Sequence, residues 1–168
     1  YNVRLEQPVP FDFIGLQYYT DPLVKLSLLG GESATRVPEE KITAYLFRQY
    51  PQGLASAIDE MSAFGKPIDL TEIGIDTGIN KGDDDHERIA YFNRIFQVVQ
   101  KALEKGKKIR SLQLWTLIDN FDWHQGWTLP NSCPIRFGLY RFDYQTGKIT
   151  PRGAVPWLKN KITQRKIV

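Results

Sequence analysis

The sequence contains a single cysteine, Cys133, so neither an intrachain disulfide nor a cysteine metal cluster can form within it. It also lacks any hydrophobic run near the ~20 residues that a membrane-spanning helix needs. No Gly-x-Gly-x-x-Gly or phosphate-loop motif accompanies any of its apolar runs. These absences exclude a disulfide-stapled fold, and they argue against a membrane protein and against a nucleotide cofactor.

The charge balance is slightly basic, with a formal net charge of +3 at pH 7. The basic residues are grouped at 101–110 and 159–166, at the ends of two predicted helices, where cations complement the helix dipole. This placement favours solvated helix ends over a nucleic-acid-binding patch. An apolar content of 42% is enough for one substantial core, so residues 1–168 are treated as a single domain.

Apolar runs and helical patterns alternate along the chain. The apolar runs predict strands at 13–16, 68–71 and 112–117. Because none of them alternates strictly, we expect burial on both faces. Helical patterns cover 39–47, 53–64, 85–104 and 152–162, with Pro51 expected to separate the first two helices. Strands that alternate with helices predict right-handed βαβ units and a parallel sheet.

The predicted strands are widely spaced, which fits barrel units with long loops better than a compact dinucleotide-binding domain. A complete (β/α)8 barrel typically takes about 250 residues, and this chain has room for about three strand–helix units. We therefore expect a partial barrel whose remaining units come from sequence outside this chain. The chain begins at Tyr1 rather than Met, in keeping with that expectation.

Aromatic and acidic side chains gather where the predicted strands end. Tyr19 follows the first strand, Glu72 follows the second, and Trp115 lies in the third. Asp122 and Trp123 come shortly after. Barrel active sites are built at the carboxyl ends of the strands. Aromatic faces beside carboxylates suit a sugar, whose C–H faces stack on rings while its hydroxyls bond to acids.

The order and spacing of these motifs resemble the C-terminal part of the retaining β-glycosidases of glycoside hydrolase family 1. The motifs are Phe13 to Tyr19, Thr71-Glu72-Ile73-Gly74 and the stretch from Trp115 to Trp123, followed by Arg136-Phe137-Gly138. The resemblance covers nearly the whole chain. It implies an α/β fold consisting of the last three βα units of a (β/α)8 TIM barrel. It also implies β-glucosidase-like hydrolysis of β-glycosides, with no cofactor.

The resemblance assigns roles to several strand-end residues. Glu72 occupies the place of the nucleophile, and Tyr19 that of a tyrosine that hydrogen-bonds the nucleophile and keeps it ionised. Gln17 replaces an asparagine of the family, and Ile73 replaces the asparagine after the nucleophile. The second replacement puts the local hydrogen bonding of Glu72 in question.

The remaining matches concern the pocket for the glycone, the sugar whose bond is cleaved. Trp115 matches the platform beneath that sugar, and Phe137 matches an aromatic side chain that lines the same pocket. Asp122 and Trp123 match a Glu-Trp pair that grips sugar hydroxyls, and the shorter aspartate withdraws the charge by about one C–C bond. Asp119 is expected instead to tie backbone amides of the loop.

Two further groups of residues are assigned structural roles. The acids at 83–85, next to His86, are expected to cap a helix rather than to bind metal, because consecutive residues there point in different directions. His124 has no Ser or Cys partner in a recognisable catalytic arrangement. We therefore predict no metal site.

The chain lacks the Asn-Glu-Pro motif that carries the family's acid/base carboxyl group. We expect the isolated segment to be inactive, and its partner to be the missing N-terminal part of the barrel, on the same or a separate chain. Two alternatives remain: a non-catalytic relative that binds sugars or partners, and an unrelated α/β domain. The compartment is unknown, with the cytoplasm slightly favoured.

Overall fold

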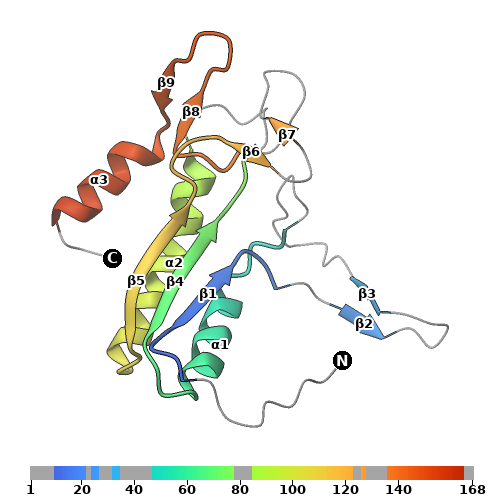
Figure 1. Cartoon of the computed structure of the whole chain (residues 1–168), viewed down its shortest axis with the longest axis vertical. Coiled ribbons are helices and arrows are strands. Elements are labelled where there is room, and N and C mark those ends of the chain that lie inside the picture. The colour runs from blue at the N-terminus through green and yellow to red at the C-terminus, as the bar shows by residue number, and fades with distance from the viewer. Residues whose placement is uncertain are drawn as a thin grey trace.

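The computed structural model describes residues 10–21, 24–26, 32–34, 47–77, 85–122, 126–127 and 136–164. Its centre is a three-stranded parallel sheet in the order β1 (Ile14–Tyr18), β4 (Ile68–Gly74) and β5 (Ile109–Trp115) (Figure 1). The middle strand, β4, buries Ile68, Leu70 and Ile73 completely. The hydrophobic core therefore begins at the central strand.

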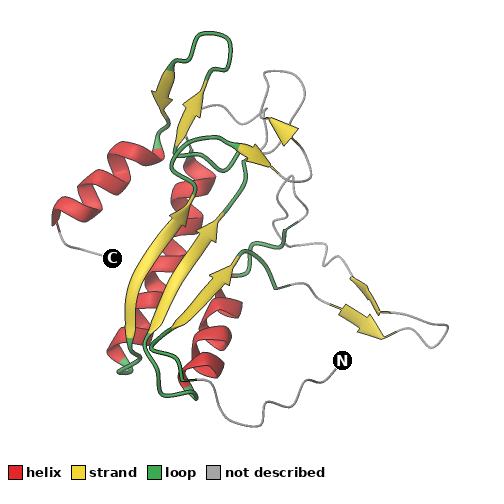
Figure 2. Cartoon of the chain, viewed as in Figure 1, coloured by secondary structure: helices red, strands yellow, loops and turns green. Residues whose placement is uncertain are grey.

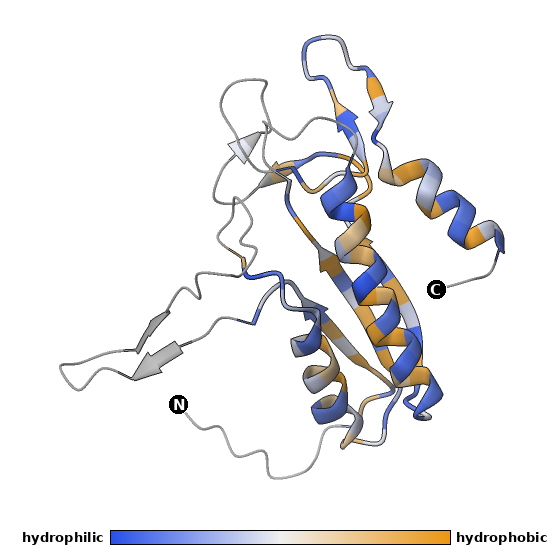
Figure 3. Cartoon of the chain, turned by 180° about the vertical axis from the view of Figure 1, so that it is seen from behind, coloured by the Kyte–Doolittle hydropathy of each residue, from blue (hydrophilic) through white to orange (hydrophobic). Residues whose placement is uncertain are grey.

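Two helices, α1 (Pro51–Ser62) and α2 (His86–Glu104), cover one face of this sheet. Seen from behind, α2 lies across β4 and β5 (Figure 3). Its buried residues recur at helical spacing, so one apolar stripe faces the strands: Tyr91, Phe92, Ile95, Phe96, Val99 and Ala102. The last helix, α3 (Ala154–Gln164), packs on α2, where Trp157 stacks on Phe96 with ring centroids 5.6 Å apart. No helix in the described ranges is long and apolar enough to cross a membrane.

Three small antiparallel pairs lie outside the central sheet (Figure 2). The first pairs β2 (Val24–Leu26) with β3 (Glu32–Ala34), and the second pairs β6 (Phe121–Asp122) with β7 (Gly126–Trp127). The third pairs β8 (Tyr140–Phe142) with β9 (Ile149–Pro151) and leads directly into α3. An isolated bridge from Ile118 to Tyr140 connects this last pair to the chain that leaves β5.

The three predicted strands and the parallel sheet are confirmed, although every boundary except the start of β4 moves by one to three residues. The helix predicted at 85–104 is confirmed as α2, with Asp85 at its N-cap position. The helix predicted at 53–64 is present as α1, which begins two residues earlier, at Pro51. A proline at that position loses no hydrogen bond, since the first N–H groups of a helix have no partner within it. The other helix expected there, 39–47, falls almost entirely outside the described residues.

The prediction that the strands are buried on both faces is wrong for β1, where exposure alternates along the strand. Gly15 and Gln17 are exposed, because helices cover only one face among the described residues. The other face is polar. There the Arg110 guanidinium donates to Asp69, with Nε 3.0 Å from Oδ1. One face of the sheet is thus an apolar core, and the other presents polar groups.

The contrast between buried and exposed positions on α2 predicts unequal losses of stability. Ile95→Ala should lower the free energy of unfolding by about 2–5 kcal/mol, since Ile95 is fully buried and its loss leaves a cavity. Leu103→Ala on the same helix is the matched control and should cost less than about 1 kcal/mol, because Leu103 is 39% exposed. Denaturant titration measures both changes. Equal losses would contradict the described packing.

Candidate functional site

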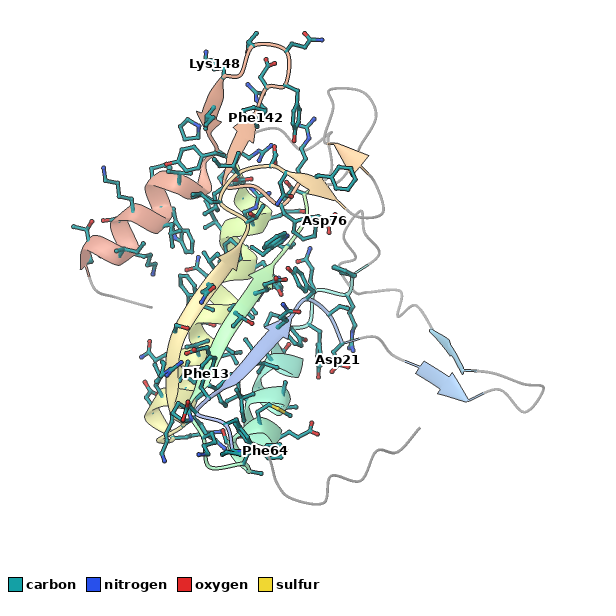
Figure 4. The ribbon with its side chains drawn as sticks, in the orientation of Figure 1. Phe13, Asp21, Phe64, Asp76, Phe142 and Lys148 are labelled. Atoms are coloured by element: carbon teal, nitrogen blue, oxygen red, sulfur yellow. The ribbon has the colours of Figure 1, made fainter. Side chains whose placement is uncertain are left out.

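The candidate site lies where the three parallel strands reach their carboxyl ends. In Figure 4, Asp21 and Asp76 mark this end, just beyond β1 and β4, and Phe13 and Phe64 mark the opposite end. Glu72 is in β4, aligned in register with Gln17 of β1. Tyr19 follows β1 directly, and Trp115 is the last residue of β5. Parallel pairing therefore brings residues far apart in sequence to one edge of the sheet.

The central contact is a hydrogen bond from the Tyr19 hydroxyl to Oε2 of Glu72, with the two oxygens 2.7 Å apart. Burial raises the pKa of the Tyr19 phenol well above its ordinary value, and the hydrogen bond to Glu72 raises it further. The Tyr19 phenol is protonated at neutral pH, as an ordinary tyrosine is, and it donates to the carboxylate. The contact expected between these two side chains is present.

An aromatic cluster surrounds the ring of Tyr19. Phe137 meets it edge-on, with ring centroids 5.9 Å apart, and Phe47 lies 5.8 Å away on the same measure. Trp115 also packs against Phe137. The sequence does not predict Phe47 as a site residue, because Phe47 follows no predicted strand. The cluster restricts where the Tyr19 ring can sit, and hence where its hydroxyl points.

Gly74 allows the Tyr19 ring and the backbone of Trp115 to lie close to β4. A Cβ atom added to Gly74 would lie 2.7 Å from the Trp115 carbonyl oxygen and 2.9 Å from Cε1 of Tyr19. Any larger residue would push these groups apart. The glycine after Ile73 therefore serves the packing of the two aromatic residues, a reason that the sequence motif alone does not supply.

Ile73, the residue that departs from the family motif, lies in the hydrophobic core. Its side chain is fully buried, whereas that of Glu72 is only partly buried. The replacement of asparagine by isoleucine therefore adds apolar surface to the core side of β4. The hydrogen bond from Tyr19 to Glu72 is made with isoleucine in this place.

Asp119 ties the loop after β5 to the segment that carries Phe137, as expected from the sequence. Its Oδ1 accepts a hydrogen bond from the Gly138 N–H, at 3.0 Å. Both carboxylate oxygens also accept from Arg152, at 3.0 and 2.7 Å, in an ion pair whose side chains are each 1% exposed. A buried, bidentate pair of this kind fixes the loop geometrically.

Asp85 does not cap α2 as predicted. It occupies the N-cap position with φ of 59°, but its side chain makes no capping hydrogen bond. Its Oδ1 instead accepts from the buried Arg88 guanidinium at 2.7 Å, and its Oδ2 accepts from the Ala154 N–H at 3.3 Å. The buried cation competes more strongly for the carboxylate than the helix N–H groups do. The other two acids of the run, 83–84, lie outside the described residues, and within the described ranges no cluster of metal-ligating side chains occurs.

Two of the predicted site residues cannot be placed as side chains. The backbone of Asp122 belongs to β6 and is paired with Gly126 of β7. Trp123 lies outside the described residues, as does His124. The structure therefore brings together Tyr19, Glu72, Trp115 and Phe137, with Gln17 aligned beside Glu72.

The chain is similar to known proteins over most of its length. The model for glycosyl hydrolase family 1 matches residues 5–167. Beta-glucosidase 47 of Arabidopsis thaliana is 30% identical over 168 residues, covering 92% of this chain and 30% of that protein. Probable inactive beta-glucosidase 14 of Oryza sativa subsp. japonica is 29% identical, covering 94% of this chain and 34% of that protein.

A solved structure extends the comparison to the fold. Beta-glucosidase from Thermotoga maritima, in complex with noeuromycin, superposes with a TM-score of 0.82 at 25% identity. The match covers 94% of this chain and 36% of that one. The chain thus spans about a third of the length of the relatives it matches. The expected fold, the C-terminal portion of a (β/α)8 TIM barrel, is confirmed.

The buried pair of Asp119 and Arg152 predicts a large loss of stability when one partner is removed. Arg152→Met should cost about 3–5 kcal/mol of unfolding free energy, because it leaves the Asp119 carboxylate buried without its cation. Arg110→Met is the matched control, since Arg110 also pairs with an aspartate but is 49% exposed. That change should cost far less, because solvent screens an exposed ion pair. Denaturant unfolding of both variants measures the two losses. An Arg152→Met variant that loses no more unfolding free energy than Arg110→Met would refute the prediction.

Proposed function

Because the chain belongs to glycosyl hydrolase family 1, we propose that it takes part in the retaining hydrolysis of β-glycosides, with Glu72 as the nucleophile. In such a reaction the carboxylate attacks the anomeric carbon as the aglycone leaves, and water then hydrolyses the glycosyl-enzyme. The relatives named as β-glucosidases support a β-glucoside as the substrate class. The proposal requires no cofactor.

The observation that carries the proposal is the 2.7 Å hydrogen bond from the Tyr19 hydroxyl to Oε2 of Glu72. A retaining nucleophile must be held in one position relative to the anomeric carbon. The hydrogen bond from Tyr19 fixes the orientation of the Glu72 carboxylate at the strand end. The partner of the carboxylate is a phenol whose ring is held in an aromatic cluster, which limits the directions from which it can donate.

The aromatic residues support a glycone pocket next to Glu72. Trp115 is partly buried and packs against the buried Phe137. The family motif assigns the Trp115 ring as the face on which the C–H groups of a sugar stack, and Phe137 as a residue that lines the same pocket. Gln17 is exposed and aligned with Glu72, so its amide is available for a sugar hydroxyl. Asp122 and Trp123 are assigned to further hydroxyl contacts on the strength of the family motif.

Hydrolysis also needs a second carboxyl group, which acts first as acid and then as base. In retaining enzymes the two carboxyl groups lie roughly 5–5.5 Å apart. The sequence lacks the Asn-Glu-Pro motif, so we assign this group to the remaining part of the barrel, on the same chain or a partner chain. That part would continue the sheet of β1, β4 and β5. Without it the segment should be inactive, since acid–base help is typically worth about 10²- to 10⁴-fold.

A second candidate function is sugar binding without catalysis. It is favoured by the similarity to a relative named as a probable inactive β-glucosidase, and by Asp122 in place of the family's glutamate. This alternative keeps the aromatic pocket but assigns no covalent chemistry to Glu72. A covalent test therefore separates the two candidates.

A mechanism-based inhibitor provides that test. A 2-deoxy-2-fluoro-β-glucoside with a good leaving group should label the full polypeptide once, and peptide mapping should place the adduct on Glu72. Glu72→Gln is the control and should remain unlabelled, because an amide is a far poorer nucleophile than a carboxylate. Intact-mass spectrometry measures both. An unlabelled wild-type polypeptide that still binds β-glucosides would favour the binding-only function.

Tyr19→Phe should lower kcat/KM for an aryl β-glucoside by about 10- to 100-fold, because hydrogen bonds to charged groups are worth about 1.5–3 kcal/mol. The neighbouring Tyr18→Phe is the control, since the Tyr18 hydroxyl donates to the Tyr50 backbone carbonyl rather than to Glu72. We expect that control to lose some stability and to keep kcat/KM within about twofold. Steady-state kinetics decides, and equal activity of the two variants would count against the role of Tyr19.

A further inference from the structure

Two buried arginines hold the backbone on either side of Phe137. The segment concerned, residues 136–140, runs beside the chain that leaves β5, with the Leu139 N–H donating to the Thr116 carbonyl at 3.0 Å. The Asp119 N–H donates in turn to the Tyr140 carbonyl, also at 3.0 Å. Phe137 therefore sits on a strip of backbone that is fixed on both sides.

Arg88 secures the residue before Phe137. Its Nη2 donates to the Arg136 carbonyl oxygen at 2.7 Å and to Oγ1 of Thr77 at 3.0 Å. Its Nη1 is held by Asp85 at 2.7 Å, and the whole side chain is buried. The Thr77 N–H also donates to the Arg136 carbonyl, at 3.0 Å. One guanidinium thus connects the start of α2, the chain after β4 and the Phe137 backbone.

Arg152 secures the residue after Phe137. Its Nη1 donates to the Gly138 carbonyl oxygen at 2.6 Å while the same guanidinium pairs with Asp119. Gly138 has no room for a side chain, because an added Cβ would lie 2.3 Å from the Asp119 backbone nitrogen. The two carbonyls that flank Phe137 are therefore each held by a different buried arginine.

Phe137 transmits this constraint to the site. Its ring meets the Tyr19 ring edge-on, and the Tyr19 hydroxyl donates to Glu72. A shift of the Phe137 backbone would move the ring that supports Tyr19, and would change the 2.7 Å contact at the carboxylate. Reaction rates are sensitive to such displacements, since about 1 Å of misplacement can cost about 100-fold.

We propose that Arg88 and Arg152 are positioning residues that hold Phe137 against Tyr19 and thereby aim Glu72 at the substrate. This inference rests on the proposed function, because it assumes that Glu72 is the nucleophile. The planar guanidinium is suited to the task, since its five N–H groups can bind a carboxylate and a carbonyl at the same time. A lysine ammonium at position 88 retains the positive charge but lacks the planar set of N–H donors that can bind two acceptors at fixed angles.

A double-mutant cycle in the full polypeptide tests the inference through Arg88. The variants are Arg88→Lys, Phe137→Leu and the combination of both. Circular dichroism is used to establish that each variant is folded. The measured quantities are the first-order rate constant of Glu72 labelling at saturating 2-deoxy-2-fluoro-β-glucoside and the half-saturating concentration. Arg110→Lys, at the opposite end of the sheet, is the matched control and should leave the labelling rate constant within about twofold.

Arg88→Lys should lower the saturating rate constant about tenfold and change the half-saturating concentration less than about threefold. In the Phe137→Leu background the same substitution should change the rate constant less than about twofold. The reason is that this background lacks the aromatic ring that contacts Tyr19. If Arg88→Lys does not fold, Thr77→Val carries the test, since it removes the hydroxyl shared with Arg88 and should lower the rate constant about threefold.

The contrary results are distinct. A folded Arg88→Lys that is labelled at the wild-type rate, or equal effects of Arg88→Lys in both backgrounds, would overturn the positioning role while leaving the proposed function intact. For the Thr77→Val variant, a rate constant equal to that of the wild type would do the same. An unlabelled wild-type polypeptide would overturn the proposed function and this inference with it.

Discussion

The parallel pairing of β4 with both of its neighbours is the constraint on which the candidate site depends. Because all three strands point the same way, their carboxyl ends meet at one edge, and residues up to about a hundred positions apart in sequence converge there. Antiparallel pairing would have sent Trp115 to the opposite end from Glu72. The apolar face beneath α1 and α2 holds this alignment, and the opposite face of the sheet is polar.

The loops beyond the sheet are fixed by buried charge rather than by apolar packing alone. Arg88 with Asp85 and Arg152 with Asp119 lie almost completely out of contact with solvent, where an unpaired charge is very unfavourable. Each arginine also donates to a backbone carbonyl of the chain that carries Phe137. Such pairs contribute little net stability compared with an apolar core, so their value lies in the single geometry that they permit.

Sequence reasoning found the parts of the site that lie at strand ends and missed those that depend on tertiary contacts. Tyr19 and Glu72 follow apolar runs, and Trp115 lies within the third run and matches the family motif. Phe47 reaches the same cluster from a segment with no such signal. The strand containing Glu72 continues to Gly74, because the polar Thr71 and Glu72 interrupt the apolar pattern without ending the pairing.

The arginines show a second limit of sequence reasoning. Arg88 sits in the first turn of α2 among ordinary helix-forming residues, and nothing in the local sequence distinguishes it from a solvated base. Its burial follows from Thr77 and the Arg136 carbonyl, which approach only in the folded chain. Likewise, Asp85 was expected to cap α2, whereas in the fold it pairs with this arginine.

The central claim is that Glu72 attacks the sugar, and the stereochemistry of a rescued reaction tests it most directly. In the full polypeptide, Glu72→Gly removes the nucleophile and leaves space for azide beside an activated β-glucoside. Direct attack by azide inverts the anomeric carbon, so the account predicts an α-glucosyl azide, identified by NMR spectroscopy. Formation of the β-glucosyl azide, or undiminished hydrolysis by the variant without azide, would contradict the assignment of Glu72 as nucleophile.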